Sequence, residues 1–192
     1  MTPDSLWEEL IFEMGTIVNS GNNQSKKFII GSGNRKAPIL FIGDDSNLFT
    51  NENLSVQPGS SGEFLVKLCD TSEIYPDLYY ITTLTKTELK YRDYFEKEQA
   101  SLKDLLDMQI ALINPKIIVA LGDRVAEILL NREVSFNEER GQVLDFAGNM
   151  KLLITFEPSF AKQSRENLGK KSQVAIEFWN DLKQIYNFVN SN

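Results

Sequence analysis

Three uninterrupted apolar runs in the chain end abruptly in polar turns. Residues 39–42 lead into Gly43-Asp44-Asp45-Ser46, residues 117–121 into Gly122-Asp123, and residues 152–156 into Glu157-Pro158-Ser159. Apolar runs without polar alternation are typical of strands covered on both faces, as in a parallel sheet between helices. Such sheets place their chemistry at the carboxyl ends of the strands. We therefore expect a site where these acidic side chains follow the strands.

Along the rest of the chain, segments with the hydrophobic spacing of helices alternate with segments typical of strands. Apolar residues at helical spacing predict helices over residues 5–19, 64–69, 102–113, 125–130 and 175–189, the first ending at Gly21-Asn22-Asn23. Short apolar or β-branched runs predict strands over residues 28–30, 39–42, 79–84, 117–121, 143–146 and 152–156. This alternation predicts an α/β fold, a three-layer sandwich with a central parallel sheet of about four strands.

Length and composition predict one domain. The chain has 192 residues, 42% of them hydrophobic, which supports a single core over residues 1–192, with residues 1–27 as an N-terminal helix and connection. No apolar run approaches the ~18 residues of a membrane span, so we expect a cytoplasmic protein without membrane association. The sequence leaves the oligomeric state open.

Two residue types restrict the chemistry. The chain has no histidine, which excludes Ser-His and Cys-His nucleophile pairs and the commonest metal ligand. Its one cysteine, Cys69, lies in an apolar helical stretch and indicates a buried, inert thiol. A single thiolate cannot hold an iron-sulfur cluster. We therefore predict no cofactor and no metal site.

Charge favours a local patch over a generally basic surface. The net charge is -7, which argues against indiscriminate DNA binding because phosphate contacts depend on Lys and Arg. Only Glu166 opposes a basic stretch that follows Ser159 and consists of Lys162, Arg165, Lys170 and Lys171. This stretch is either a phosphate-binding patch or an ordinary solvated surface.

Several short motifs resemble those of family-four uracil-DNA glycosylases in order and spacing. They are Gly31-Ser32-Gly33-Asn34, Ala37-Pro38-Ile39-Leu40-Phe41-Ile42-Gly43, Gly59-Ser60-Ser61-Gly62, Tyr80-Ile81-Thr82-Thr83, Asn114-Pro115, Arg140-Gly141 and Phe156-Glu157-Pro158-Ser159. The resemblance covers residues 28–186. It implies a uracil-DNA glycosylase-like domain with a base-binding cleft at the strand ends.

The resemblance also assigns roles, and the chain departs from several of them. Asp44 matches the family's acid that orients the attacking water, and Asp45 matches the water-activating Asp of another branch. Gln57 replaces the base-stacking Phe, Thr83 the base-reading Asn, and Glu157 the catalytic His. The four iron-sulfur cysteines of the family are missing, and two of their positions fall near Thr87 and Leu102, so no cluster is expected. We place the base pocket at Gly43, Ser46, Gln57, Thr83 and Ser159.

These departures predict weak or absent uracil activity. Uracil leaves as an anion, and a Glu157 carboxylate opposes that charge. Two like charges at ~4 Å and an effective dielectric of ~20 repel by about 4 kcal/mol, on the order of a thousandfold in rate. Only a protonated Glu157 could replace the His, and one Thr83 hydroxyl cannot match an amide's paired donor and acceptor.

Three functional hypotheses remain. The first is a DNA glycosylase in which Asp44, Asp45 and Glu157 form an acidic pocket for a damaged base, such as a cationic alkylated purine; solvated turns or helix caps are the alternative explanation of these acids. The second is a catalytically lapsed fold that binds nucleic acid or a protein partner, with Lys162, Arg165, Lys170 and Lys171 on phosphates. The third is an unrelated doubly wound domain for a small nucleotide or sugar phosphate, although no complete phosphate fingerprint is present.

Overall fold

The computed structural model describes residues 2–20 and 28–191, and across them the strands form one six-stranded sheet. The order is β1-β3-β2-β4-β6-β5. The strands are β1 (Ser32–Gly33), β2 (Ile39–Gly43), β3 (Tyr79–Thr83), β4 (Ile117–Leu121), β5 (Val143–Asp145) and β6 (Lys151–Thr155). The four central strands are parallel, while β1 and β5 pair antiparallel at the two edges. The predicted four-stranded parallel sheet is confirmed, with an antiparallel strand added on each side.

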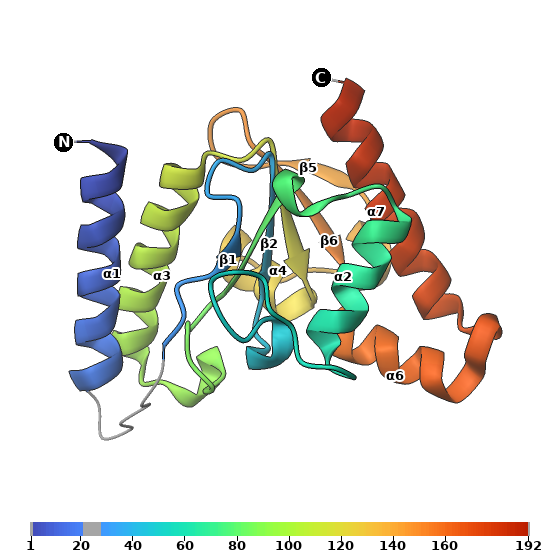
Figure 1. The fold of residues 1–192 in the computed structure, drawn as a ribbon, viewed down its shortest axis with the longest axis horizontal. Helices are drawn as coiled ribbons and strands as arrows, with labels where there is room; N and C mark the ends of the chain where they lie inside the picture. Colours follow the sequence, from blue (N-terminus) through green and yellow to red (C-terminus); the bar gives the residue numbers. More distant parts are fainter. Residues whose placement is uncertain (1, 21–27, 192) are drawn as a thin grey trace.

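Helices cover both faces of this sheet (Figure 1). They are α1 (Pro3–Ser20), α2 (Ser61–Thr71), α3 (Glu96–Ile113), α4 (Asp123–Leu130), α5 (Phe136–Glu139), α6 (Pro158–Leu168) and α7 (Gln173–Ser191). Four 3-10 turns lie in the connections: η1 (Ser46–Leu48), η2 (Pro76–Leu78), η3 (Tyr91–Asp93) and η4 (Gly169–Lys171). Figure 1 shows α1 and α3 together at one end of the molecule and α2, α6 and α7 at the other.

Alternate residues of each central strand enter different cores. On β2, Leu40 and Ile42 pack with α1, α3 and α4, whereas Ile39 and Phe41 pack with α2, α6 and α7. All five residues of β2, β3 and β4 are buried. Burial on both faces removes the need for polar alternation, which explains the continuous apolar runs.

One local prediction was wrong, and one helix was not predicted. Residues 28–30 form no strand; the edge strand is β1, where Ser32 and Gly33 pair with Ile81 and Tyr80. The stretch after Ser159, for which the sequence pattern predicted no element, is part of the helix α6, which has Pro158 in its first turn. Proline suits that position because its missing N–H would have had no partner in the helix. The predicted end of the first helix at Gly21-Asn22-Asn23 lies outside the described residues.

Across the described residues, no helix is long and apolar enough to cross a membrane. Within the same part of the chain, no group of three or more Asp, Glu or Cys side chains is placed to hold a metal ion.

Candidate active site

The carboxyl ends of β2, β3, β4 and β6 open onto one edge of the sheet, because these strands are parallel and in register. Gly43 ends β2, Thr83 ends β3, and Leu121 ends β4. Gly43 is packed so closely that an added Cβ would lie 2.5 Å from Leu48 Cδ1. The loops that leave these strand ends carry most of the predicted site residues.

Asp44 is held by the backbone of a distant loop. The Tyr91 N–H donates to both of its carboxylate oxygens, at 3.1 and 3.2 Å. Burial raises the pKa of Asp44 to about 6; the hydrogen bond from Tyr91 and the charge of Lys90 act against this rise, and the charge of Glu157 adds to it. A carboxylate with such a pKa is suited to accept a proton near neutral pH.

Asp45 has different partners from Asp44, and both of its carboxylate oxygens accept hydrogen bonds within the fold. Its Oδ1 accepts from the Asn47 N–H at 2.9 Å, which caps η1. Its Oδ2 accepts from the Ser61 hydroxyl at 2.6 Å, which ties the loop after β2 to the start of α2. Asp45 therefore acts as a helix cap, which was the alternative explanation of this acid in the sequence analysis.

Glu157 lies at the N-terminus of α6, directly over the end of β4. A Cβ added to Gly122 would be 2.7 Å from Glu157 Cγ, so the two chain segments touch only because residue 122 is a glycine. The Glu157 side chain is exposed and makes no capping hydrogen bond to α6. Glu157 lies close enough to Asp44 for its charge to raise the pKa of that carboxyl, whereas the carboxylate oxygens of Asp45 bind Asn47 and Ser61.

A partly buried cluster of Arg140, Thr155 and Asp181 fixes the end of β6. Arg140 Nη1 donates to both carboxylate oxygens of Asp181 at 2.8 Å, and the Thr155 hydroxyl donates to the same carboxylate at 2.6 Å. The Arg140 guanidinium also lies 5.0 Å from the centre of the Phe156 ring. These contacts hold the residues just before Glu157, which gives the predicted Arg140-Gly141 motif a structural role.

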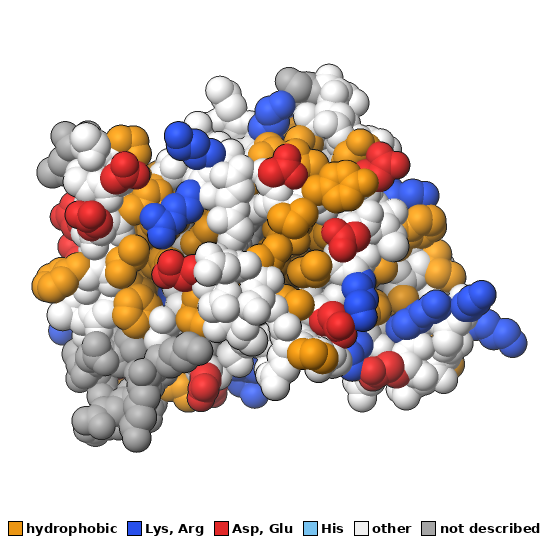
Figure 2. All heavy atoms as spheres, in the orientation of Figure 1, with side chains coloured by type: hydrophobic (Ala, Val, Ile, Leu, Met, Phe, Trp, Pro, Cys, Tyr) orange, Lys and Arg blue, Asp and Glu red, His pale blue; other side chains and the backbone are white. Residues whose placement is uncertain are grey.

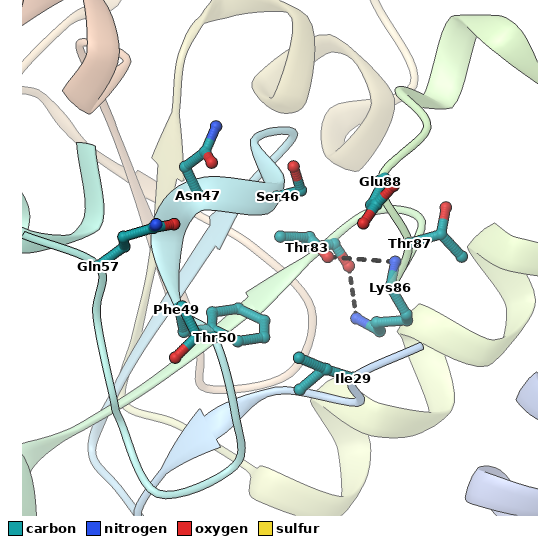
Figure 3. A pocket seen from close by; sticks show the side chains of 10 residues that line it. All are labelled: Ile29, Ser46, Asn47, Phe49, Thr50, Gln57, Thr83, Lys86, Thr87 and Glu88. Carbon is teal, nitrogen blue, oxygen red and sulfur yellow. Dashed lines mark hydrogen bonds between the residues drawn. The ribbon is translucent and has the colours of Figure 1, made fainter. Parts of the chain in front are cut away.

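A cavity of about 380 Å³ opens beside the ends of β2 and β3, and we call it the strand-end pocket (Figure 3). Its lining consists of Ile29, Ser46, Asn47, Phe49, Thr50, Gln57, Thr83, Lys86, Thr87 and Glu88. Ser46, Gln57 and Thr83, three of the predicted base-pocket residues, therefore meet in one cavity. Neither Asp44 nor Glu157 is part of this lining.

A second, more open hollow lies between α2 and α6, and we call it the α2–α6 groove. Asp45, Gln57, Ser159 and Lys162 line it, with Asn47, Pro58, Gly59, Ser60, Ser61, Gln163 and Glu166. Lys162 pairs with Glu166 on the same helix, so this cation has a carboxylate partner already. Ser159 is thereby separated from the strand-end pocket where the sequence had placed it.

Seven of the ten described lining residues, Phe49 and Lys86 among them, were not predicted for the base pocket. Phe49 supplies an aromatic wall, and Lys86 places a buried amine beside Thr83 (Figure 3). Phe49 lies in a polar stretch without a period, and Lys86 lies in the run Thr85-Lys86-Thr87, which resembles an exposed turn. No local pattern signals that either side chain turns inward.

Comparison with known proteins agrees with this geometry. A protein-family model described as the uracil DNA glycosylase superfamily matches residues 30–183. The chain belongs to this superfamily. A type-4 uracil-DNA glycosylase of Thermotoga maritima is 32% identical over 165 residues, covering 84% of this chain and 82% of the relative. A protein of the same name from Archaeoglobus fulgidus is 24% identical, covering 82% and 80%.

The match confirms the fold and the resemblance that the sequence predicted, and the alternative of an unrelated doubly wound domain is wrong. The iron-sulfur cluster implied by the family-four resemblance does not fit the residues present. Cys69, the chain's one cysteine, is fully buried within α2. Near two of the expected cluster positions are Thr87, which is hydrogen-bonded to Tyr94, and the buried Leu102. Side chains without thiolates cannot replace the cluster's ligands.

Proposed function

We propose that the chain hydrolyses the N-glycosidic bond of a damaged base in DNA, with weak or no activity on uracil. The main support for this proposal is the placement of Asp44. It directly follows β2, its pKa is raised to about 6, and it lies two residues before Ser46, which lines the strand-end pocket. Membership of the superfamily supports a glycosylase, and the pocket supplies space for a base.

In this proposal each residue has a distinct task. The base leaves the DNA stack and enters the strand-end pocket, where Phe49 offers an aromatic surface and Gln57 and Thr83 offer polar groups to its edges. Asp44, ionised at neutral pH, orients water toward C1′ of the sugar and accepts its proton. The bond from C1′ to the base nitrogen breaks, a bond from C1′ to the water oxygen forms, and the base keeps the electron pair.

Weak uracil activity follows from what surrounds the departing base. Glu157 stands close enough to Asp44 for its charge to raise the pKa of that carboxyl. A second carboxylate at this edge disfavours negative charge on a leaving uracil. Thr83 offers one hydroxyl, so it reads a pyrimidine edge less completely than an amide.

A single-turnover base-release assay tests the proposal. The substrates are single- and double-stranded oligonucleotides that carry uracil, hypoxanthine or an alkylated purine. The variants are Asp44→Asn and, as a matched control, Asp45→Asn. We expect Asp44→Asn to lower release by about 100-fold or more, because it removes the proton acceptor. Asp45→Asn keeps release near the wild-type rate, because Asn also caps a helix well. Unchanged release in Asp44→Asn contradicts the assigned role.

A second candidate is a catalytically lapsed fold that binds nucleic acid. Figure 2 shows Lys and Arg side chains gathered over the end of the molecule that α6 forms in Figure 1. The predicted phosphate contacts Lys162, Arg165, Lys170 and Lys171 lie on α6 and η4, and the last two are exposed. Salt-dependent DNA binding without release of any base favours this candidate. If DNA binding is also absent, a protein partner is the remaining alternative.

A further inference from the structure

Lys86 is a buried amine in the wall of the strand-end pocket. It lies three residues after the end of β3, in the left-handed region at φ 61°, and its side chain is only 2% exposed. Figure 3 shows the side chain extending from its loop toward Thr83. Among the described residues that line this pocket, it is the one Lys or Arg.

The hydrogen bonds of Lys86 leave its charge unmatched. Its Nζ donates to Thr82 Oγ1 and to the Thr83 carbonyl oxygen, the latter at 2.5 Å. When the amine is protonated it has three N–H donors, so one remains after these two bonds. Among the described residues, no carboxylate forms an ion pair with Lys86. Burial lowers the pKa of this amine well below its ordinary value.

A buried cation without a partner is costly unless a ligand supplies negative charge or a hydrogen-bond acceptor. The two neutral partners fix the position of Nζ beside Thr83, which shares the lining of the strand-end pocket with Lys86. Negative charge brought to within ~4–6 Å favours the protonated form of the amine. A positively charged base has the opposite effect, because a like charge in a desolvated pocket repels it.

We propose that Lys86 donates its third N–H to a carbonyl oxygen of the bound base and stabilises the negative charge that the base carries as it leaves. The inference rests on the proposed glycosylase function and names its leaving group: a base with a carbonyl oxygen that departs as an anion. When the bond from C1′ to the base nitrogen breaks, the electron pair passes to the base and is delocalised onto that oxygen. Lys86 thus supplies part of the stabilisation of negative charge that a Glu157 carboxylate cannot supply.

The dependence of the rate on leaving-group stability tests this role. Single-turnover release is measured from single-stranded oligonucleotides with uracil or 5-fluorouracil, using wild type, Lys86→Met and Lys86→Gln. Fluorine stabilises the departing anion, so 5-fluorouracil needs less assistance. We expect both variants to lower uracil release by about 100-fold and 5-fluorouracil release much less. Thermal melting confirms folding, and the Gln variant, which keeps an N–H donor without charge, carries the comparison if the Met variant does not fold.

The other outcomes separate this inference from the function it rests on. Equal losses for the two bases overturn the role of Lys86, because a merely structural lysine affects both substrates alike. If the wild type releases an alkylated purine but does not release uracil, 5-fluorouracil or hypoxanthine, the role of Lys86 is also overturned. The proposed glycosylase function then still holds. No release of any base by the wild type overturns the proposed function and, with it, the role of Lys86.

Discussion

The Tyr91 N–H donates to both carboxylate oxygens of Asp44, at 3.1 and 3.2 Å. This contact joins the loop after β2 to the first residue of η3, 47 positions further along the chain. It fixes the orientation of the carboxylate from the backbone, so no neighbouring side chain has to do so. An ionised Asp44 therefore has a defined direction even though burial disfavours its charge.

The pH dependence of base release should report Asp44. Because the pKa of Asp44 is about 6 and the ionised form accepts the proton, the rate constant should fall as the pH drops through about 6. The measurement is single-turnover base release between pH 4.5 and 8. The wild-type rate constant should fall roughly tenfold for each pH unit below that value. The residual rate constant of Asp44→Asn should show no such decrease. A wild-type rate that stays level down to pH 4.5 would contradict the prediction.

Asp44 should also lower stability at neutral pH. Its pKa rises from 3.8 to about 6 on folding, so the folded state binds the proton more tightly than the unfolded state. Unfolding free energy is therefore lost as pH rises from 3.8 to about 6, and the loss is complete above it. Asp44→Asn should raise the unfolding free energy at pH 7.5 by up to about 3 kcal/mol.

Urea unfolding of wild type and Asp44→Asn at pH 7.5 and pH 4 measures this difference. The gap between the two proteins should shrink at pH 4, where Asp44 is mostly protonated in the folded state. A variant that is less stable than wild type at both pH values would show that the carboxylate contributes a net stabilising contact.

Gly122 should be required for the position of Glu157. Its φ is +110°, and an added Cβ would lie 2.7 Å from Glu157 Cγ. Gly122→Ala should lower the unfolding free energy by about 1–3 kcal/mol through backbone strain, and by more through this contact. Gly148→Ala is the control, because Gly148 also has a positive φ but nothing lies within 4 Å of its added Cβ.

A double-mutant cycle isolates the contact between the two residues. Glu157→Ala combined with Gly122→Ala should recover part of the lost stability, because it removes the atom that the new Cβ meets. If the two effects are simply additive, the contact does not contribute and backbone strain accounts for the whole loss.

DNA binding through α6 and η4 should depend on salt. Each phosphate contact contributes a slope of about -0.7 to a plot of log affinity against log salt for single strands and about -0.9 for duplex. Replacing Arg165, Lys170 and Lys171 together with Ala should therefore flatten the slope by about 2–3 units. Lys162→Ala should change it less, because Lys162 is paired with Glu166.

Fluorescence anisotropy with a labelled oligonucleotide, measured from about 50 to 200 mM salt, gives these slopes. Lys97→Ala on α3 serves as the control, because α3 and α6 lie at opposite ends of the molecule in Figure 1. Equal flattening in this control and in the triple variant would argue against a phosphate-binding surface on α6.

The elements that the sequence mispredicted or missed have weak local sequence patterns. Residues 28–30 are apolar but belong to no strand, and the two-residue strand β1 exists only because Ser32 and Gly33 meet the edge of β3. The helix α6 has a polar, basic sequence with little apolar periodicity, so the sequence pattern did not predict it. It has Pro158 in its first turn, and its buried Ala161 lies on the face that packs with α2 and α7.

The sequence by itself determined the layers of this protein and the edge of the sheet at which its candidate site lies. Continuous apolar runs require burial on both faces, and parallel strands bring their carboxyl ends to one edge, so both conclusions follow from local patterns. Only the tertiary structure decided which acids meet. Asp44 and Asp45 are neighbours in sequence, yet Tyr91 and Ser61 hold them in different directions, and Lys86 reaches Thr83 through a left-handed turn. Side-chain direction in a loop depends on contacts with distant segments, which no local pattern records.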